Sequence, residues 1–439
     1  MRKTKQFLLM AAMLLCSVGA RAAYEKINGV WINITSEANL TAEVVYDPYG
    51  YSGNVIIPET IVRLGKTYRV TAIASSAFDG DIDVTSVFIP ESVTSIGPYA
   101  FRNCSGMKNI NFPKNCRADL DAFLDCTGEL TLSRNLPLVQ VGHPVKYYGY
   151  FYGSKFTSVV IEEGVTSVGP YAFWNCTTIT TVNIPKSVTA INDMAFFGCN
   201  NLTDLTLHSN PLISAGSIPS TTRVNLVLND DEAADFNVAN ANTYDRVVYN
   251  RELGAGKYGT IMLPFAPDAE SMENFAFYSL SSVDGETLIF DEVATPLANT
   301  PYLYALREGE SATQITGGET TIASVIATPE IDGWKTVGSF INQTVDCSAG
   351  DACYYAINAA DNMLYNVVSK MHVKPSRAYF KSSANVSQLC IRTRDGGETL
   401  IDAVKVADFT PTVYYDLSGR RVENPTEGIY IVNGKKVVL

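Results

Sequence analysis

A short pattern that recurs through the first half of the chain limits its possible folds more than any other feature. The pattern reads V-T-x-I/V-x-x-x-A-F, and its final Phe is followed 23 residues later by the next in both neighbouring pairs. A fixed period of this length is typical of repeat proteins whose units stack in a row. Two further Phe residues fill the gap between the pairs, so the sequence predicts six units. The six closing residues are Phe78, Phe101, Phe123, Phe151, Phe173 and Phe196.

Each regular unit continues through a polar loop into a short strand with alternating side chains. In the second unit Ile110 and Phe112 alternate with Asn109 and Asn111, so one face is apolar and the other polar. One unit has too few apolar side chains to close a core, and its inward residues must therefore pack on neighbouring units. We expect a mainly β solenoid with repeats over residues 70–210. Residues 23–69 should form strands that cap its start, and residues 211–250 should cap its end.

The outward positions of the repeat strands are the candidate ligand-binding residues. They are mixed in identity and mostly small and polar, which favours contact with a protein surface or an extended glycan over a buried small molecule. Phe88 is the exception, and it indicates either a covering loop or an anchor of the kind that dominates interfaces. The predicted positions are Ser86, Phe88, Asn109, Asn111, Ser158, Val160, Thr181, Asn183, Asp204 and Thr206.

The repeat resembles a known family. The longer pattern V-T-x-I-G-P-Y-A-F-x-N-C is almost intact at Val93–Cys104 and at Val165–Cys176. It is similar to the BspA-like leucine-rich repeats of secreted and surface proteins from Bacteroidetes and other host-associated microbes, over about residues 50–210. The resemblance implies a leucine-rich-repeat fold and a role in attachment to host proteins or other bacteria. It implies no particular ligand.

The N-terminus predicts export. Arg2, Lys3 and Lys5 precede an apolar run, and Ala20-Arg21-Ala22 supplies a cleavage site, so residues 1–22 are expected to be a secretory signal peptide. No later stretch approaches the roughly 20 apolar residues of a spanning helix, so we expect no transmembrane segment. The net charge of −12 at pH 7 makes the chain a poor partner for nucleic-acid phosphates. We expect a secreted or cell-surface protein that binds an extracellular protein or a glycan.

Past residue 250 the 23-residue period ends and short strands with turn signals follow. Asp284-Gly285 lies between two such strands and predicts a hairpin turn. Regularly spaced short strands favour a β-sandwich-like domain over residues 251–400. The segment resembles an uncharacterised module that follows such repeats in secreted Bacteroidetes proteins, through Tyr258–Phe265 and Asn299–Tyr304.

The last segment, residues 401–439, predicts a small antiparallel sheet. Asn433-Gly434 favours a tight turn between alternating strands. Val413–Val422 and Gly428–Val437 resemble the short C-terminal module of many exported Bacteroidetes proteins, including the type IX sorting signal. That resemblance implies a sorting or anchoring role. The alternative is a terminal hairpin that completes the preceding domain.

The sequence offers little that indicates catalysis. The three histidines, His143, His208 and His372, have no zinc-binding spacing, and no cofactor motif is present. We therefore expect no enzyme activity, no metal and no cofactor. Two alternatives stay open, a glycan-acting enzyme and a structural module of a surface assembly. A glycosidase needs two converging carboxylates, and the adjacent Asp291 and Glu292 should face opposite sides of a strand.

Cysteines and tyrosines complete the set of candidate residues. Cys104, Cys126, Cys176 and Cys199 each lie three residues after a repeat Phe, so we expect free thiols buried in the stacked core. Cys347 and Cys353 bracket a hairpin-like loop and are the possible disulfide. An aromatic cluster in the longest unit either packs around Phe151 or contacts a ligand. Its members are Tyr147, Tyr148, Tyr150 and Tyr152.

Overall fold

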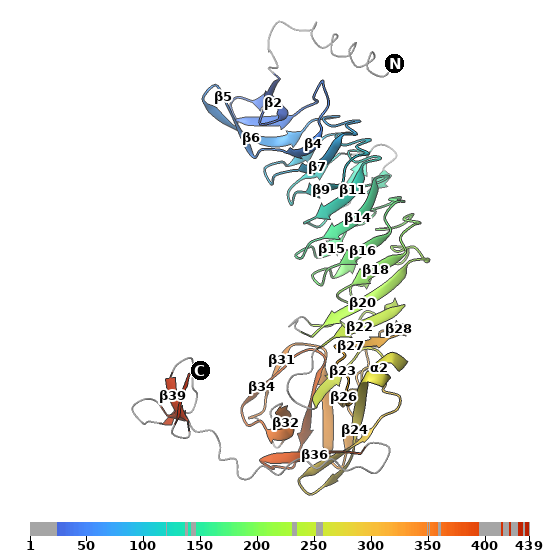
Figure 1. Ribbon diagram of the computed structural model, residues 1–439, viewed down its shortest axis with the longest axis vertical. Helices are drawn as coiled ribbons and strands as arrows, with labels where there is room; N and C mark the ends of the chain where they lie inside the picture. The colour runs from blue at the N-terminus through green and yellow to red at the C-terminus, as the bar shows by residue number, and fades with distance from the viewer. Residues whose placement is uncertain are drawn as a thin grey trace.

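The structure is a computed structural model in which the chain is elongated (Figure 1). It describes residues 24–394 except 120, 137–138, 142–145, 231–234, 252–257, 349, 351 and 359–360, together with 414–415, 421–422, 429–432 and 435–438. The expected signal peptide, residues 1–22, lies outside the described residues.

One long sheet carries the repeats, with one strand from each unit. All neighbouring strands in this run pair in parallel, as stacking of like units requires. The strands are β4 (Gly53–Ile56), β7 (Val84–Phe88), β9 (Asn109–Phe112), β11 (Thr127–Leu132), β14 (Lys155–Ile161), β16 (Thr181–Ile184), β18 (Asp204–Leu207), β20 (Arg223–Asn229) and β22 (Arg246–Asn250). The sheet thus begins before residue 70 and continues beyond residue 210, into both predicted caps.

The V-T-x-I segments form a second, narrower side of the solenoid. There β8 (Ser95–Ile96) lies between β6 (Lys66–Ile73) and β10 (Arg117–Ala118), and all three are parallel. Further along, β17 (Ala190–Ile191) lies between β15 (Ser167–Val168) and β19 (Leu212–Ile213), again in parallel. After β6, this second side of the solenoid is therefore built from two-residue strands and turns.

The repeat Phe residues form a continuous column inside the solenoid, as the sequence predicts. Successive ring centroids from Phe78 to Phe196 lie 5.0, 5.4, 5.2, 5.6 and 5.3 Å apart. Tyr51 extends the column by one ring, 4.4 Å from Phe78. Each of the six Phe side chains is buried.

The start of the solenoid is covered by strands. In this cap β1 (Glu25–Ile27), β2 (Val30–Ser36) and β3 (Thr41–Val44) pair antiparallel in sequence order. β3 then joins β6 in parallel, and β5 (Thr60–Arg63) forms a hairpin with β6. Residues of β2 and β3 such as Val30 and Val44 belong to the same buried cluster as the repeat core.

The C-terminal half is one curled ten-stranded sheet, and the expected β-sandwich is not confirmed. Parallel pairing of β25 with β36 joins two groups of antiparallel strands into a single sheet. In order across it lie β23 (Gly259–Met262), β26 (Pro301–Leu306), β24 (Phe275–Asp284), β25 (Thr287–Glu292), β36 (Gln388–Arg394), β33 (Met363–Asn366), β32 (Cys353–Asn358), β35 (Arg377–Ser382), β30 (Trp334–Ser339) and β29 (Glu330–Ile331). The predicted hairpin at Asp284-Gly285 joins β24 to β25.

Smaller elements complete this half. Helix α2 (Ala269–Asn274) begins at Asp268, whose carboxylate accepts a hydrogen bond from the Ser271 amide. β31 (Gln343–Asp346) and β34 (Lys370–Val373) form a separate antiparallel pair.

A strand from the C-terminal half completes the solenoid sheet. β27 (Gln314–Gly317) pairs antiparallel with β22, and so ends the run of parallel strands. A second link joins β21 (Thr243–Tyr244) to β28 (Thr320–Thr321). One buried apolar cluster runs from the repeats into residues such as Ile261 and Phe277. The solenoid and the curled sheet therefore share a core across residue 250.

Polar contacts hold the end of the repeats to the segment that follows them. The buried Asn210 side chain donates to the carbonyl oxygens of Asn237 (2.6 Å) and Asn240 (2.8 Å). The side-chain carbonyl oxygen of Asn210 accepts a hydrogen bond from the Tyr244 hydroxyl at 2.6 Å.

The terminal module is a four-stranded antiparallel sheet. It is formed by β37 (Tyr414–Tyr415), β38 (Arg421–Val422), β39 (Ile429–Val432) and β40 (Lys435–Val438). β39 and β40 pair with two residues between them, as the predicted tight turn requires, although Asn433 and Gly434 lie outside the described residues. Across the part of the chain that is described, no helix has the length and apolarity needed to cross a membrane.

Candidate functional site: the outward face of the solenoid sheet

Outward side chains of the repeat strands align in two rows across the main sheet. Strand register places the first row along Asn54, Ser86, Asn109, Glu129, Ser158, Thr181, Asp204 and Arg223. The second row contains Ile56 beside Phe88, and then Asn111, Thr131, Val160, Asn183, Thr206, Asn225 and Arg246. All ten predicted positions lie in these rows, and the residues that alternate with them are buried.

Members of the rows that sequence reasoning missed come from the less regular units. They are Asn54, Ile56, Glu129, Thr131, Arg223, Asn225 and Arg246. The strands that carry them lack a complete V-T-x-I-x-x-x-A-F segment in the preceding unit. For β11 the sequence does carry a signal that could have predicted the outward residues, because Glu129 and Thr131 alternate with the buried Leu130 and Leu132.

The rows differ in character along the solenoid. At its start Phe88 is 55% exposed and its register partner Ile56 is 60% exposed, so no loop among the described residues covers Phe88. At its end Arg223 donates a 3.0 Å hydrogen bond to Asp204, which lowers the pKa of that carboxyl group. Between them Asn111 is engaged with the backbone of Ile89, donating to its carbonyl oxygen at 2.8 Å and accepting from its amide at 2.7 Å.

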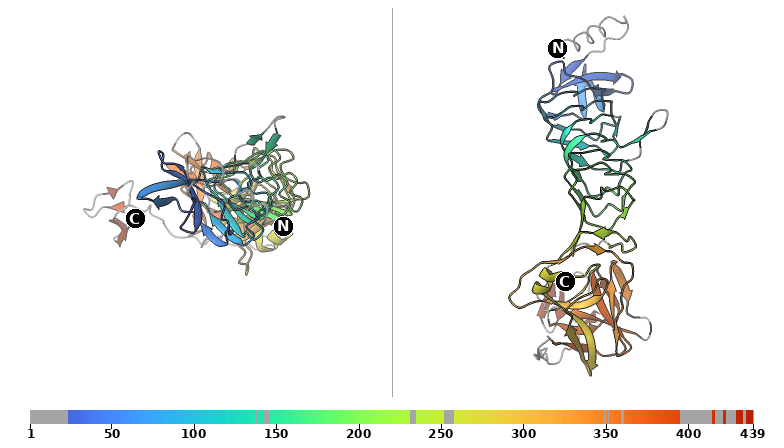
Figure 2. Two further views of the ribbon diagram at one scale, coloured as in Figure 1. Left: turned by 90° about the horizontal axis from the view of Figure 1, so that it is seen from above. Right: turned by 90° about the vertical axis from the view of Figure 1, so that its right-hand side faces the viewer.

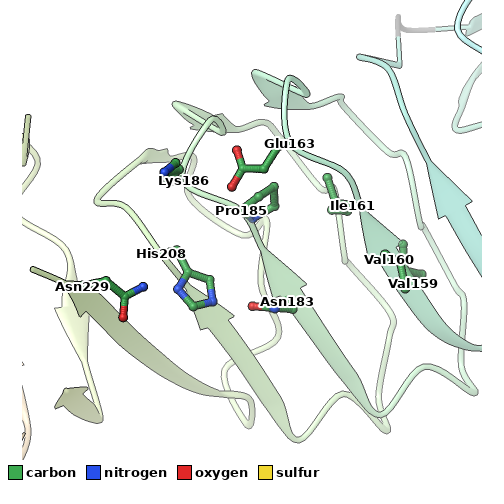
Figure 3. A pocket seen from close by; sticks show the side chains of 9 residues that line it. All are labelled: Val159, Val160, Ile161, Glu163, Asn183, Pro185, Lys186, His208 and Asn229. Carbon is green, nitrogen blue, oxygen red and sulfur yellow. The ribbon is translucent and has the colours of Figure 1, made fainter. Parts of the chain in front are cut away.

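A shallow groove of about 340 Å³ lies where β14, β16 and β18 end (Figure 3). Val160 and Asn183 of the second row belong to its lining. His208 directly follows β18, Asn229 ends β20, and Glu163 and Lys186 come from the loops that follow β14 and β16. The sequence predicted no ligand-binding role for His208, Asn229, Glu163 or Lys186.

The groove offers varied polar groups above an apolar floor. An imidazole, two carboxamides, an ammonium and a carboxylate lie near Val159 and Ile161. Such a set hydrogen-bonds well to peptide groups or sugar hydroxyls. In the described part of the chain, no three His, Cys, Asp or Glu side chains are placed to hold a metal ion.

The carboxylates considered for an enzyme are paired with arginines. Asp291 forms an ion pair with Arg394 at 2.6 Å, and Glu292 forms one with Arg307. Each carboxylate is therefore neutralised by its own partner, and no observation here favours them as a catalytic pair.

The repeat cysteines are free and buried, as predicted. Three of these thiols also donate a hydrogen bond to the backbone carbonyl oxygen of the repeat Phe in the preceding unit. The sequence did not indicate these hydrogen bonds. Cys104 donates to Phe78 at 3.1 Å, Cys176 to Phe151 at 3.0 Å, and Cys199 to Phe173 at 3.1 Å. The cysteines thus link neighbouring units as well as filling space.

The predicted disulfide between Cys347 and Cys353 is wrong, because both are free thiols in the structure. Cys347 follows β31 and packs with Met371 and Tyr379. Cys353 begins β32 in the curled sheet and packs against a different apolar cluster. A loop that looks like a hairpin in sequence therefore joins strands of two different sheets.

The tyrosine cluster divides between two environments. Tyr150 is buried, with its ring 5.6 Å from Phe112, as core packing requires. Tyr152 is partly exposed and its ring lies 5.4 Å from Trp174. The backbones of Tyr147 and Tyr148 lie in β13 (Lys146–Tyr148), which pairs with β12 (Val139–Val141), and their side chains are outside the described set. Figure 2 shows this strand pair beside the stacked units.

The part of this chain that is similar to known protein families is its repeat region. Residues 60–133 and 147–217 match the family model for the BspA type leucine rich repeat region, in six copies. No curated protein matches the chain.

Similar solved structures include a leucine rich cell surface protein from Faecalibacterium prausnitzii A2-165, at 23% identity with a TM-score of 0.33. The likeness covers 52% of this chain and 60% of that one. A leucine-rich repeat protein from Bacteroides ovatus ATCC 8483 is 21% identical over 49% of this chain and 66% of that one, with a TM-score of 0.28. The chain therefore spans less than two thirds of either protein. The stacked units of the solenoid are therefore the part of the chain that is similar to BspA type leucine rich repeats.

Proposed function

We propose that this chain is a secreted or cell-surface binding protein that contacts an extracellular protein or glycan through the two outward rows of its solenoid sheet. The observation that carries the proposal is the contrast between the two faces of one sheet. Inward positions repeat as large apolar residues, whereas outward positions in register with one another differ in size, charge and hydrogen-bonding capacity. Packing does not constrain the outward set, so its variety is available for recognition.

The shape and composition of the face favour a macromolecular ligand. Parallel strands from β4 to β22 present the rows side by side, and a sheet of this kind offers area without depth. The exposed pair Ile56 and Phe88 supplies apolar contact at one end, and the groove beside Asn183 and His208 supplies hydrogen bonds further along. Interfaces commonly combine such an aromatic anchor with a polar surround.

Binding can be tested without shortening the chain. A protein comprising residues 23–439 is first applied to an array of glycans and host proteins to find a ligand. Phe88→Ala and His208→Ala are then compared with Leu297→Ala, which removes a 65% exposed side chain from the other half. We expect the two face variants to weaken binding by tenfold or more, with the control unchanged. If folded face variants bind as the wild type does, the repeat face is not the site.

We also propose that residues 1–22 direct export and are removed, and that residues 401–439 serve sorting or anchoring. N-terminal sequencing of the protein recovered from the producing cell should begin at Ala23. Deletion of residues 401–439 should change the amount of the protein held on the cell. A first residue other than Ala23, or an unchanged distribution, contradicts the corresponding proposal.

A further inference from the structure

A cavity of about 350 Å³ lies in the C-terminal half, at the seam where β23, one edge strand of the curled sheet, lies against the start of β35. On one side is β23, which pairs through its backbone with β26. On the other side is β35, which meets β23 through few contacts. The Thr260 hydroxyl donates to the Ala378 carbonyl oxygen at 2.7 Å, and the Met262 amide donates to the Ser376 carbonyl oxygen at 3.2 Å. The seam is therefore held in place but left open beside Thr260.

The charges around this cavity have one sign, although the chain as a whole is acidic. Arg251 and Arg377 belong to its lining, with side chains that are 10% and 20% exposed, and the exposed His372 and Lys374 belong to it as well. No carboxylate belongs to the lining residues that the structure describes.

One carboxylate outside the cavity has to balance both arginines. Asp230 lies 2.5 Å from Arg377, and the Tyr249 hydroxyl also donates to it, at 2.6 Å. Burial by itself raises the pKa of Asp230, but these hydrogen bonds outweigh burial and lower it. Its nearest approach to Arg251 is 3.8 Å, which is too long for a hydrogen bond.

Arg251 therefore keeps its charge in poorly compensated surroundings. Its side chain is 10% exposed, and its buried Nε atom reaches no hydrogen-bond acceptor in the described part of the chain. Nη1 donates to the Thr260 carbonyl oxygen at 2.9 Å, and the guanidinium lies 4.6 Å from the centre of the Tyr304 ring. Burial lowers the pKa of Arg251, because the charged form loses hydration. Two buried cations that share one anion make a site where a second anion is favoured.

We propose that this cavity binds the carboxylate of a small organic acid, with Arg251 and Arg377 at its base and Lys374 at its rim. A guanidinium presents paired N–H groups that match the two oxygens of a carboxylate. Most of the remaining lining, which includes Tyr258, Met371 and Tyr379, is apolar or aromatic and suits a carbon or sugar body better than a bare inorganic ion. This site is separate from the repeat face and does not depend on the function proposed for that face.

The test measures binding of carboxylates to the full chain by calorimetry and by shifts in melting temperature. The probes are glucuronate, N-acetylneuraminate and benzoate, with glucose as an uncharged match for glucuronate and inorganic phosphate as a bare anion. Lys374→Glu reverses the exposed rim charge and should weaken carboxylate binding at least tenfold. Lys370→Glu makes the same charge change at another exposed position, at the start of β34 and outside the cavity lining, and should leave binding unchanged.

Saturable binding of at least one carboxylate, absent for glucose and lost in Lys374→Glu alone, supports the site. Three results overturn it: no carboxylate binds, phosphate binds while the organic acids do not, or Lys370→Glu weakens binding as much as Lys374→Glu does. Because both substituted lysines are exposed, their variants are expected to fold, and their unliganded melting temperatures check this.

Discussion

Asp81 is a buried carboxyl group whose ionisation affects the stability of the fold. The side chain is only 8% exposed, and its Oδ2 atom has no hydrogen-bond partner among the described residues. Burial raises the pKa of Asp81 to about 6, and the nearby Asp47 and Asp79 add to the shift, although the Tyr51 amide opposes it. A buried acid with a raised pKa costs the folded state free energy whenever it is ionised.

This gives a pH-dependent prediction. The folded state binds the Asp81 proton more tightly than the unfolded state does, so the cost is full above pH 6 and disappears as the pH falls toward 4. A shift of this size corresponds to roughly 3 kcal/mol at most. We expect Asp81→Asn to raise the melting temperature at pH 7–8 and to change it little at pH 4. Asp83→Asn removes an exposed charge that adds only the smallest part of the shift, so it should raise the melting temperature much less. An equal gain at both pH values would disprove the assignment.

The thiols provide a second prediction at this scale. Burial raises the pKa values of Cys116 and Cys199 to about 12, and raises the pKa of Cys176 as well, so none is a reactive thiolate at neutral pH. In the native protein the repeat thiols should resist alkylation, whereas the partly exposed Cys353 and Cys390 react first. Mass spectrometry after labelling, with and without denaturant, measures this. A disulfide in the native protein would contradict the structure.

At the scale of the element, the repeat motif is explained by how closely neighbouring turns stack. A Cβ atom at Gly169 would lie 1.9 Å from the Leu136 carbonyl oxygen, so only glycine fits there. Tyr171 and Asn175 then adopt left-handed backbone angles, with φ of 57° at each. The tight turn brings Phe173 into the aromatic column. The Gly, Phe and Cys positions of G-P-Y-A-F-x-N-C thus each meet a geometric demand of stacking.

The aromatic column should carry much of the stability of the repeats. Phe173 lies between Phe151 and Phe196, with its ring 5.6 and 5.3 Å from theirs. Phe173→Ala should cost roughly 3–5 kcal/mol, as truncation of a large core side chain does. Phe197→Ala removes a ring that is 47% exposed and should cost much less. Denaturant unfolding of the two variants measures the difference, and similar losses would mean that the column is not the main support.

For the whole molecule, the decisive feature is the junction of the two halves. β27 extends the solenoid sheet, and Phe236 and Phe340 pack across the junction with centroids 5.8 Å apart. The Asp230–Arg377 ion pair joins the same regions, and each side chain is about one fifth exposed, at 18% and 20%. A chain that ends at residue 250 would expose the edge of β22 and part of the core, so single substitutions probe the junction better than truncation does.

Loss of this ion pair should destabilise both halves together. Asp230→Asn leaves Arg377 without its charged partner, and we expect a cost of roughly 2–4 kcal/mol, somewhat below that of a fully buried pair. Asp204→Asn breaks the more exposed pair with Arg223 and should cost no more than about 1 kcal/mol. Hydrogen exchange can report each half separately. Faster exchange in the C-terminal half alone would show that the halves are not coupled through this contact.

The sequence by itself determined the parts of the protein that depend on local periodicity. The 23-residue spacing predicts the Phe column and the buried thiols, and the alternation along each strand predicts which side chains face outward. These features follow from short-range patterns, because every unit meets the same neighbours in the same way. The predicted outward residues therefore lie in common rows. The outward residues that the sequence did not predict belong to strands where the repeat pattern weakens.

Only the tertiary structure decided what happens where the repeat ends. Pairing of β27 with β22, the single curled sheet and the separation of Cys347 from Cys353 all depend on which distant strands become neighbours. Outside a repeat, the sequence of a strand indicates where the strand begins and which of its faces is apolar. It does not indicate which other strand will be its neighbour in the sheet. The cavity beside Arg251 and Arg377 has the same origin, since its lining comes from two segments, within residues 251–260 and 356–379, that are distant in sequence and meet only when the sheet curls.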